Sequence, residues 1–213
     1  MGEFLHEEGI EEIEKRDRKN YLNTLDIDSG EIKTIVLDSK ESQEILAGKR
    51  PEIFSVADLE SLSEIEKNSF GEELQEEPED LLEEIQSGGN ILFFIREKGE
   101  LAGYLFAKPA DKAYENFVEV GLPSDDFDAS KNNLYVEAIA GKLGVFARRI
   151  YHYLENQAAE IGYSKISLHA INPNLAELLK KEGFVSKKEI QNWLGHRAEY
   201  LEKEINQKEL KKI

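Results

Sequence analysis

Residues 134–170, LYVEAIAGKLGVFARRIYHYLENQAAEIGYSKISLHA, contain the pattern that decides the fold. Leu134–Ala140 is rich in apolar residues and suits a buried strand, interrupted only by Glu137. From Leu143 onward the apolar residues recur at steps of three, one and four, which predicts one long helix. A glycine that suits a helix C-cap follows, and Lys165–Ile171 then shows the alternation of a strand. The stretch therefore predicts strand, glycine turn, helix and strand.

The turn 141–148, between that strand and helix, is the first place to look for a function. Gly141 and Gly144 flank its first half. A strand that enters a helix through a glycine turn presents the free N–H groups of the helix N-terminus, where anionic phosphates bind well. The turn therefore predicts an anion site. The alternative is that both glycines only shape a tight connection.

The composition excludes several classes of protein. The 213 residues, 40% of them hydrophobic, are enough for one sizeable domain and an extension. The absence of cysteine excludes disulfides, thiolate metal sites and a cysteine nucleophile, and the four histidines are far apart, so no metal site is expected. No apolar run approaches the roughly 20 residues of a membrane span. Because the N-terminus is too charged for a signal peptide, a cytoplasmic location is expected.

The chain is strongly acidic, with a formal net charge of −17 at pH 7. This charge repels phosphates and argues against binding to nucleic acid. It is compatible with a cationic substrate such as a lysine-bearing peptide or a polyamine. The alternative is that the acidic residues only keep the protein in solution.

Composition divides the chain into three parts. Residues 1–48 are expected to form an N-terminal extension, with a helix over Glu8–Tyr21 and a short strand at Ile32–Leu37. The main domain is expected at residues 49–207, and residues 208–213 form a charged tail. The extension is expected to pack on the domain, to exchange between subunits or to stay mobile.

The main domain alternates strands with helices. The predicted element order is β-α-α-β-β-β-α-β-α-β-β, which indicates an α/β or α+β fold. The expected elements are a strand at 52–55, helices at 55–68 and 79–85, strands at 90–96 and 101–108, a long loop at 109–133, the strand–helix–strand of 134–170, a helix after Asn172, and strands from Phe184 and from Ala198.

This order and three motifs resemble the GNAT superfamily of acyl-CoA-dependent N-acetyltransferases over about residues 50–206. The motifs are LYVEAIA as the central strand, RIYHYLENQAAEIGYSKISLHA as the following helix and strand, and NPNLAELLKKEGF as the next helix. Asn172, Ala176, Gly183 and Phe184 match the family pattern in the last motif. The resemblance implies a mixed, mostly antiparallel sheet flanked by helices. It also implies transfer of an acetyl group from acetyl-CoA to a primary amine of a small molecule or a protein.

The resemblance implies where the cofactor arm of acetyl-CoA would bind. In this family the exposed backbone of the central strand pairs with the pantetheine arm, at a splay between the fourth and fifth strands. The matching positions here are Ala138, Ile139 and Ala140. Asn172 matches a further cofactor-contacting position, although it also suits a helix N-cap.

The family's Gln/Arg-x-x-Gly-x-Gly/Ala turn, which holds the pyrophosphate, is only partly matched. Counting along the helix sets Lys142, Val145 and Ala147 at its three defined positions, and Gly144 falls one residue early. Val145 thus stands where the family has a glycine, although a glycine allows the backbone to approach a phosphate closely. A shift in register would let Gly144 do this work, with Arg148 or Arg149 as the charged partner. The implied contacts are Lys142, Leu143, Gly144, Val145, Phe146, Ala147 and Arg148.

Glu137 is the predicted catalytic base. It is a carboxylate in the middle of an apolar strand, where burial disfavours the charged form, and several family members use a glutamate on this strand. The alternative is that its side chain reaches solvent at the splay or pairs with a lysine. Glu119 is a weaker second candidate.

The family's usual general acid, a tyrosine four residues before the Gly-Phe pair, is replaced here by Leu179. Possible substitutes are Tyr135, Tyr151 and Tyr153, although such aromatic residues are more often part of a core. His169, on the strand after the helix, would either face the substrate cleft or be structural.

Two functions of different classes remain open. The first is an N-acetyltransferase with acetyl-CoA as co-substrate and Glu137 as base. The second is a catalytically inactive GNAT-fold module that binds a partner or ligand, because both the central glycine and the tyrosine are replaced. A homodimer through the closing strands or the N-terminal extension is possible.

Overall fold

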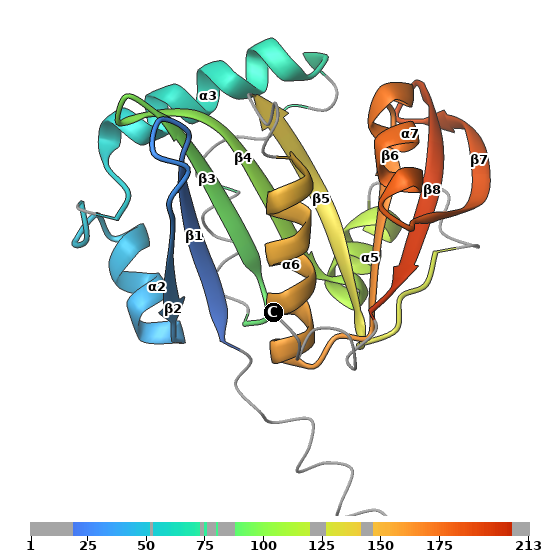
Figure 1. The fold of residues 1–213 in the computed structure, drawn as a ribbon, viewed down its shortest axis with the longest axis horizontal. Coiled ribbons are helices and arrows are strands. Elements are labelled where there is room, and N and C mark those ends of the chain that lie inside the picture. The colour runs from blue at the N-terminus through green and yellow to red at the C-terminus, as the bar shows by residue number, and fades with distance from the viewer. Residues whose placement is uncertain are drawn as a thin grey trace, which may run out of the picture.

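The computed structural model describes residues 19–51, 53–72, 75, 80, 88–119, 127–141 and 147–205. They form one eight-stranded sheet in the order β2-β1-β3-β4-β5-β6-β8-β7 (Figure 1). The strands are β1 Asn20–Asp26, β2 Ile32–Leu37, β3 Ile91–Glu97, β4 Glu100–Pro109, β5 Asn133–Gly141, β6 Lys165–Ala170, β7 Val185–Trp193 and β8 His196–Glu204. The helices are α2 Ser39–Leu46, α3 Val56–Ser69, α5 Ala110–Glu119, α6 Ala147–Ile161 and α7 Pro173–Lys181.

The sheet is mixed and mostly antiparallel. The pairs β1–β3 and β5–β6 are parallel, and the other five pairs are antiparallel. Helices α6 and α7 pack on one face, and α2, α3 and α5 pack on the other. Figure 1 shows α6 in front of the sheet and α5 behind it. The predicted fold class is therefore confirmed.

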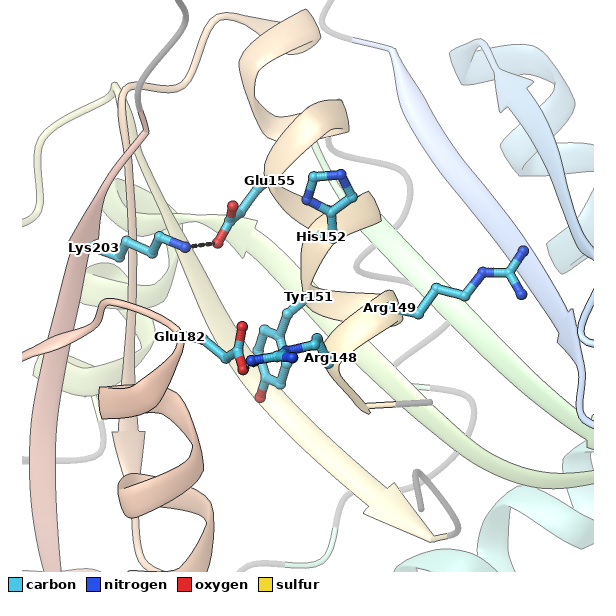
Figure 2. A pocket seen from close by; sticks show the side chains of 7 residues that line it. All are labelled: Arg148, Arg149, Tyr151, His152, Glu155, Glu182 and Lys203. Carbon is cyan, nitrogen blue, oxygen red and sulfur yellow. Dashed lines mark hydrogen bonds and ion pairs between the residues drawn. The ribbon is translucent and has the colours of Figure 1, made fainter. Parts of the chain in front are cut away.

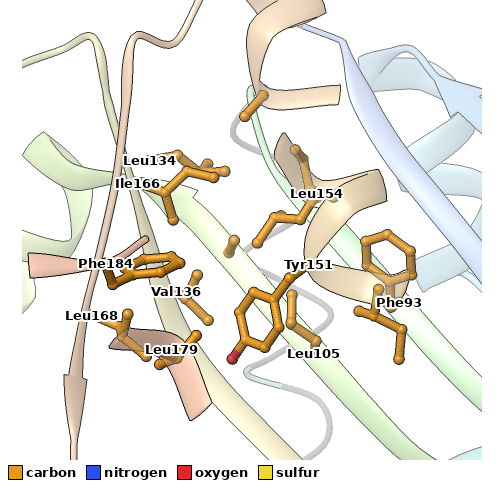
Figure 3. Close-up of a cluster of buried hydrophobic side chains, with 14 of the residues drawn as sticks. Phe93, Leu105, Leu134, Val136, Tyr151, Leu154, Ile166, Leu168, Leu179 and Phe184 are labelled. Carbon is orange, nitrogen blue, oxygen red and sulfur yellow. The ribbon is translucent and has the colours of Figure 1, made fainter. Parts of the chain in front are cut away.

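The strand, helix and strand predicted for residues 134–170 are present as β5, α6 and β6. The C-cap prediction also holds, because Gly162 has φ +104° and donates its N–H to the carbonyls of Ala158 and Ala159. The apolar stripe of α6 packs into a core with α7 and the sheet, drawn in Figure 3. The predicted helix start at Leu143 lies outside the described residues, because the described helix begins at Ala147.

The N-terminal region contributes two strands to this sheet and one helix that packs on it. β1 pairs in parallel with β3, and β2 pairs with β1, so residues 20–46 and the main domain share one sheet. The predicted strand Ile32–Leu37 is confirmed. The predicted helix Glu8–Tyr21 is wrong at its end, because Asn20 and Tyr21 belong to β1, and the rest of it lies outside the described residues.

β1 escapes prediction because asparagines occupy two of its buried positions. Asn23 is fully buried and is paired with Gln157 of α6 through two amide hydrogen bonds of 2.8 and 2.7 Å. Its side-chain oxygen also accepts from Thr34 of β2 at 2.7 Å, and its amide donates to the Leu92 carbonyl of β3 at 3.0 Å. Buried polar groups are tolerated where they are hydrogen-bonded, and this network joins β1 to three neighbouring elements.

The predicted strand at 52–55 is wrong. Ile53 and Phe54 form a turn whose N–H groups donate to the Arg50 carbonyl at 2.9 and 3.2 Å. Both side chains are buried in the core under α3, which explains their apolar character without a sheet. β1 supplies the first strand instead. The predicted helix at 79–85 falls on residues of which only Asp80 is described.

The predicted long loop at 109–133 contains a helix. Pro109 ends β4, and α5 follows at once, burying Ala110, Ala113 and Phe117 at helical spacing. Phe117 is therefore on a helix and not in a loop. The prolines and acidic residues around this helix obscured its short apolar face. Residues 120–126 lie outside the described part.

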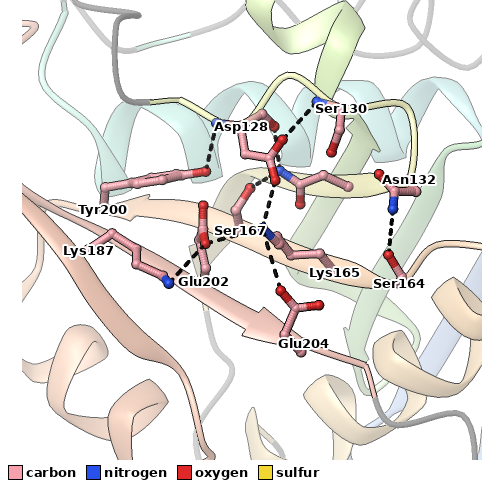
Figure 4. Close-up of polar contacts among 11 residues, drawn as sticks. Asp128, Ser130, Asn132, Ser164, Lys165, Ser167, Lys187, Tyr200, Glu202 and Glu204 are labelled. Carbon is pink, nitrogen blue, oxygen red and sulfur yellow. Dashed lines mark hydrogen bonds and ion pairs between the residues drawn. The ribbon is translucent and has the colours of Figure 1, made fainter.

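β5 and β6 are held together at one end by polar contacts (Figure 4). Lys165, the first residue of β6, binds Asp128 at 2.7 Å and Glu202 of β8 at 3.4 Å. Burial by itself would lower the pKa of Lys165, but the hydrogen bond to Asp128 and the charge of Glu202 raise it above the usual value. Asn133 donates to Ser167 at 2.9 Å across the two strands. These contacts fix the end of the strand pair at which β5 and β6 both begin.

Candidate functional site

β5 and β6 diverge after their first four residues. They pair only from Asn133–Lys165 to Val136–Leu168, while β5 continues to Gly141 along β4. The opening between the two strands is visible in Figure 1. In the described part of the chain, the β5 backbone after Val136 therefore has no strand partner on its β6 side.

A β-bulge lies at the start of this divergence. In the β4–β5 register Ala107 is opposite Val136 and Phe106 is opposite Ala138, so Glu137 is the extra residue. As a result Val136 packs in the core on the α6 side and Ala138 packs in the core on the α3 side. A bulge of this kind redirects side chains next to it. The bulge sets the direction of Glu137 at the opening.

A cavity of about 900 Å³ lies at the opening. Its wall is formed by the end of α3, by α5, by β5 on both sides of the bulge, by the end of β6 with the start of α7, and by the β7–β8 turn. The predicted site residues Glu137, Ala138, Ile139 and Asn172 all line it. Ala140 does not line it but packs on the α3 side.

Glu137 forms an ion pair with a lysine that the sequence did not single out. Its carboxylate lies 2.7 Å from the Nζ of Lys108 on β4, and the two side chains are 13% and 1% exposed. The alternative that Glu137 pairs with a lysine is thus correct. A neighbouring ammonium favours the charged carboxylate. Glu119 lies exposed at the end of α5 and does not line the cavity.

A second carboxylate lines the same cavity. Glu66 of α3 is 3% exposed and accepts a hydrogen bond from the hydroxyl of Tyr104 on β4, itself 1% exposed. The sequence carried a signal for this position, because Glu66 follows Leu62 by four residues on the buried face of the helix. An acidic residue on an apolar helix face is a reason to expect a buried carboxylate.

The wall next to β6 is aromatic. The ring of His169 stacks on Trp193 with centroids 3.7 Å apart, and its Nδ1 lies 3.0 Å from the hydroxyl of Tyr135. Burial lowers the pKa of His169 to about 3, so the imidazole is neutral at pH 7. Phe117 of α5 meets Trp193 edge-on and completes this wall. His169 thus faces the cavity, as one of its two predicted placements requires.

Several solved acetyltransferases share this architecture. The ribosomal-protein-S18-alanine N-acetyltransferase from Escherichia coli superposes with a TM-score of 0.51, with 14% identity, over 71% of this chain and 90% of that one. Aminoglycoside 6'-acetyltransferase type Ii gives 0.50, with 17% identity, over 70% and 90%. A Desulfovibrio desulfuricans protein assigned to the GNAT family gives 0.50, with 13% identity, over 68% and 92%. The chain has the GNAT fold. No protein-family model and no curated protein matches its sequence.

On the face of the sheet that α6 covers, a second hollow of about 490 Å³ lies beside the first turns of α6 (Figure 2). Arg148 forms an ion pair of 2.8 Å with Glu182, but its side chain is 75% exposed. Lys203 of β8 pairs with Glu155, and Arg149 donates to the Gly30 carbonyl. The predicted phosphate partner Arg148 therefore already has an anionic partner that a ligand would have to share or displace.

The structure describes only some of the other residues that were predicted to contact the cofactor. Ala147 is the buried first residue of α6. Asn172 caps α7, with its side chain accepting from the N–H of Asn174 at 2.9 Å, and it also lines the larger cavity. The remaining predicted contacts, which lie outside the described residues, are Lys142, Leu143, Gly144, Val145 and Phe146.

The three candidate tyrosines have different surroundings in this GNAT fold. Tyr135 lines the larger cavity. Tyr151 is buried in the α6-side core next to Leu179 and Phe184 (Figure 3). Its hydroxyl has no hydrogen-bond partner among the described residues, and burial raises its pKa. Tyr153 is half-buried, with the Arg149 guanidinium 5.9 Å from its ring centre. Tyr135 is thus the candidate that borders the larger cavity.

The described part of the chain shows neither a cluster of metal ligands nor a membrane-spanning helix. No three His, Asp or Glu side chains there are grouped so that they could hold a metal ion. No helix there is both long and apolar enough to cross a lipid bilayer.

Proposed function

We propose that this protein transfers an acetyl group from acetyl-CoA to a primary amine. The observation that carries the proposal is the free edge of β5, which lies along a large cavity beside a half-buried carboxylate, in a GNAT fold. An extended amide-bearing chain can add to such an edge as a further strand. Residues 138–141 would hold the pantetheine arm in this way, and the thioester would then lie in the cavity near Glu137.

The residues of the cavity can supply both proton transfers of the reaction. When the amine nitrogen attacks the thioester carbonyl and the C–S bond breaks, the amine loses a proton and the thiolate gains one. Glu137 would accept the first proton, and Lys108 keeps its carboxylate charged beforehand. Tyr135 would donate the second, since this residue lines the cavity and its hydroxyl lies 3.0 Å from the Nδ1 of neutral His169.

The second candidate, a GNAT-fold module without catalysis, has its own support. Leu179 replaces the family's tyrosine and is fully buried in the core. The negative charge of Glu137 is already balanced by the ammonium of Lys108. Such a module would bind a ligand in the cavity without transferring a group. The predicted cytoplasmic location and homodimer remain predictions.

Acetyl-CoA binding is the first test. Ligand at one hundred times its Kd raises the free energy of unfolding by about 2.7 kcal/mol, which thermal denaturation detects easily. We expect a clear rise of Tm with millimolar acetyl-CoA. An unchanged Tm would contradict the acetyltransferase proposal.

The second test measures acetylation of a panel of amines by Glu137→Gln. Loss of a general base commonly costs about a hundredfold or more in rate, so we expect a fall of this size in kcat. Glu119→Gln is the matched control, because Glu119 is exposed and is not one of the residues that line the cavity, and it should keep the parent rate. Acetyl-CoA binding without acetylation of any amine would favour the GNAT-fold module without catalysis. Equal rates for the two variants would remove Glu137 from the mechanism.

A further inference from the structure

Tyr151 of α6 has a hydroxyl group that the packing of the fold does not use. The residue is 2% exposed, and its hydroxyl has no hydrogen-bond partner among the described residues. A buried polar group without a partner lowers stability, whereas a phenylalanine would fill the same apolar core without that cost. The presence of the hydroxyl therefore indicates a role in binding and not in packing.

Tyr163 in the same core shows how a buried tyrosine is usually accommodated. It is 0% exposed, and its hydroxyl donates to the carbonyl of Gly89 at 3.0 Å. Most buried hydroxyl groups are hydrogen-bonded in this way. The two tyrosines are almost equally buried, so burial alone does not account for the hydroxyl of Tyr151.

The ring of Tyr151 is directed toward the place where β5 and β6 separate. In Figure 3 it projects from α6, and its hydroxyl points away from Leu134 and Ile166. These two residues are a pair in the part where the strands are bonded to each other, and the last such pair is Val136 with Leu168. The hydroxyl is therefore directed toward the stretch of β5 whose edge is free.

Tyr151 lies between the second hollow and the larger cavity. It lines the second hollow together with the cationic side chains of Arg148, Arg149 and Lys203. Its core also borders the larger cavity, because four residues of that core line this cavity as well: Val136, Ile139, Leu168 and Leu175. A ligand that extends from the second hollow to the larger cavity along the free edge of β5 therefore passes Tyr151.

Acetyl-CoA has the groups that this path requires. Its phosphates are at one end, its thioester is at the other, and the pantetheine arm between them carries two amide groups. An amide carbonyl accepts a hydrogen bond from a phenol, and such a bond is strong in a core of low dielectric constant. Burial raises the pKa of Tyr151, so the hydroxyl keeps its proton and can donate it to a carbonyl.

We propose that the Tyr151 hydroxyl donates a hydrogen bond to an amide carbonyl of the pantetheine arm. The backbone of residues 138–141 holds the arm at the edge of the sheet, and Tyr151 binds it from the α6 side. This inference rests on the proposed acetyl transfer. It goes further by assigning a binding residue on α6, whereas the proton transfers stay with Glu137 and Tyr135.

Tyr151→Phe tests the proposal because it removes only the hydroxyl. Loss of one hydrogen bond should raise the Kd of acetyl-CoA about threefold to tenfold in calorimetry. Adenosine 3′-phosphate 5′-diphosphate, the nucleotide part of CoA without the arm, should bind the variant and the parent protein equally. In urea without ligand, the denaturation midpoint of Tyr151→Phe should equal or exceed that of the parent, since no bond within the fold is lost.

Tyr163→Phe is the matched control, because it removes a buried hydroxyl that has a partner in the fold. Neither hollow is lined by Tyr163. This variant should therefore show the opposite pattern, with a lower urea midpoint and an unchanged Kd for acetyl-CoA.

The outcomes separate this inference from the proposed function. Equal Kd values of acetyl-CoA for the parent and Tyr151→Phe would overturn the inference while acetyl transfer stands. A urea midpoint of Tyr151→Phe as low as that of Tyr163→Phe would also overturn it, because the hydroxyl would then have a partner within the fold. If acetyl-CoA binds and depends on Tyr151 but no amine is acetylated, the inference holds and the proposed function fails. If the parent does not bind acetyl-CoA, both are wrong.

Discussion

Replacement of Gly141 by alanine tests how the free edge of β5 is held in place. Gly141 ends β5 with φ +75°, and a Cβ built there would lie 2.6 Å from the Cα of Gly103 and closer still to the carbonyl oxygen of Ala102. Both of these atoms belong to the backbone of β4, which cannot rotate away as a side chain can. The substitution must therefore move one strand relative to the other.

The magnitude follows from two separate costs. A left-handed backbone costs a residue with a Cβ roughly 1–2 kcal/mol, and overpacking against a rigid neighbour adds about 1–3 kcal/mol. We therefore expect Gly141→Ala to lower the free energy of unfolding by about 2–5 kcal/mol. Gly195→Ala is the matched control, because Gly195 has φ +82° but open space around its Cβ position, and only the first cost applies.

Urea denaturation of the two variants measures both values. The difference between them isolates the contact of Gly141 with β4, and we expect it to be about 1–3 kcal/mol. Equal destabilisation in the two variants would refute the close approach of β5 and β4 at this point. Acetyl-CoA should also bind Gly141→Ala less tightly, because the shifted segment is the one proposed to hold the pantetheine arm.

Two further predictions concern stability. Asn23→Ala removes the two hydrogen bonds that the buried amide of Gln157 makes with Asn23, so it should lower the free energy of unfolding by about 1–3 kcal/mol. Urea denaturation measures this loss, and an unchanged midpoint would contradict the network. Burial lowers the pKa of His169 from 6.5 to about 3, so the folded protein binds fewer protons than the unfolded chain between these values, and stability falls as the pH drops below 6.5. His169→Phe should remove up to about 1.4 kcal/mol per pH unit of that slope, and parallel stability profiles between pH 7 and 4.5 would contradict the shift.

The part of the fold that could be predicted is the part where burial and periodicity agree. Leu134–Ala140 and the following helix bury apolar residues at the spacing of their own secondary structure, so their pattern was sufficient. β1 was missed because Asn20 and Asn23 fill buried positions, and their partners lie far away in the sequence. The segment at Ile53 was misassigned because an apolar side chain is buried equally well from a turn.

The strand that carries the site could be predicted from the sequence, but the contacts of its side chains could not. Glu137 stood out as a charge in an apolar strand, but its pairing with Lys108 depends on the β4–β5 register, which includes a bulge. No local pattern encodes that register. Glu66 was open to prediction from its place on the buried face of α3, whereas its bond to Tyr104 required the packing of α3 on β4.

The parallel pairing of β1 with β3 has a consequence for synthesis of the chain. Asn20 and Asn90, which lie beside each other at the start of the two strands, are 70 residues apart. β3 ends at Glu97, 60 residues after the end of β2 at Leu37. At a translation rate of about 5–20 residues per second, the β1–β2 hairpin therefore exists for about 3–12 s before its partner strand is complete. During that interval the edge of β1 that later pairs with β3 is open to other chains. Ile35 and Val36 of β2 add an apolar surface, since they are exposed even in the finished fold. The yield of folded protein should therefore depend on how fast ribosomes translate residues 38–97, and on chaperones that bind the nascent hairpin.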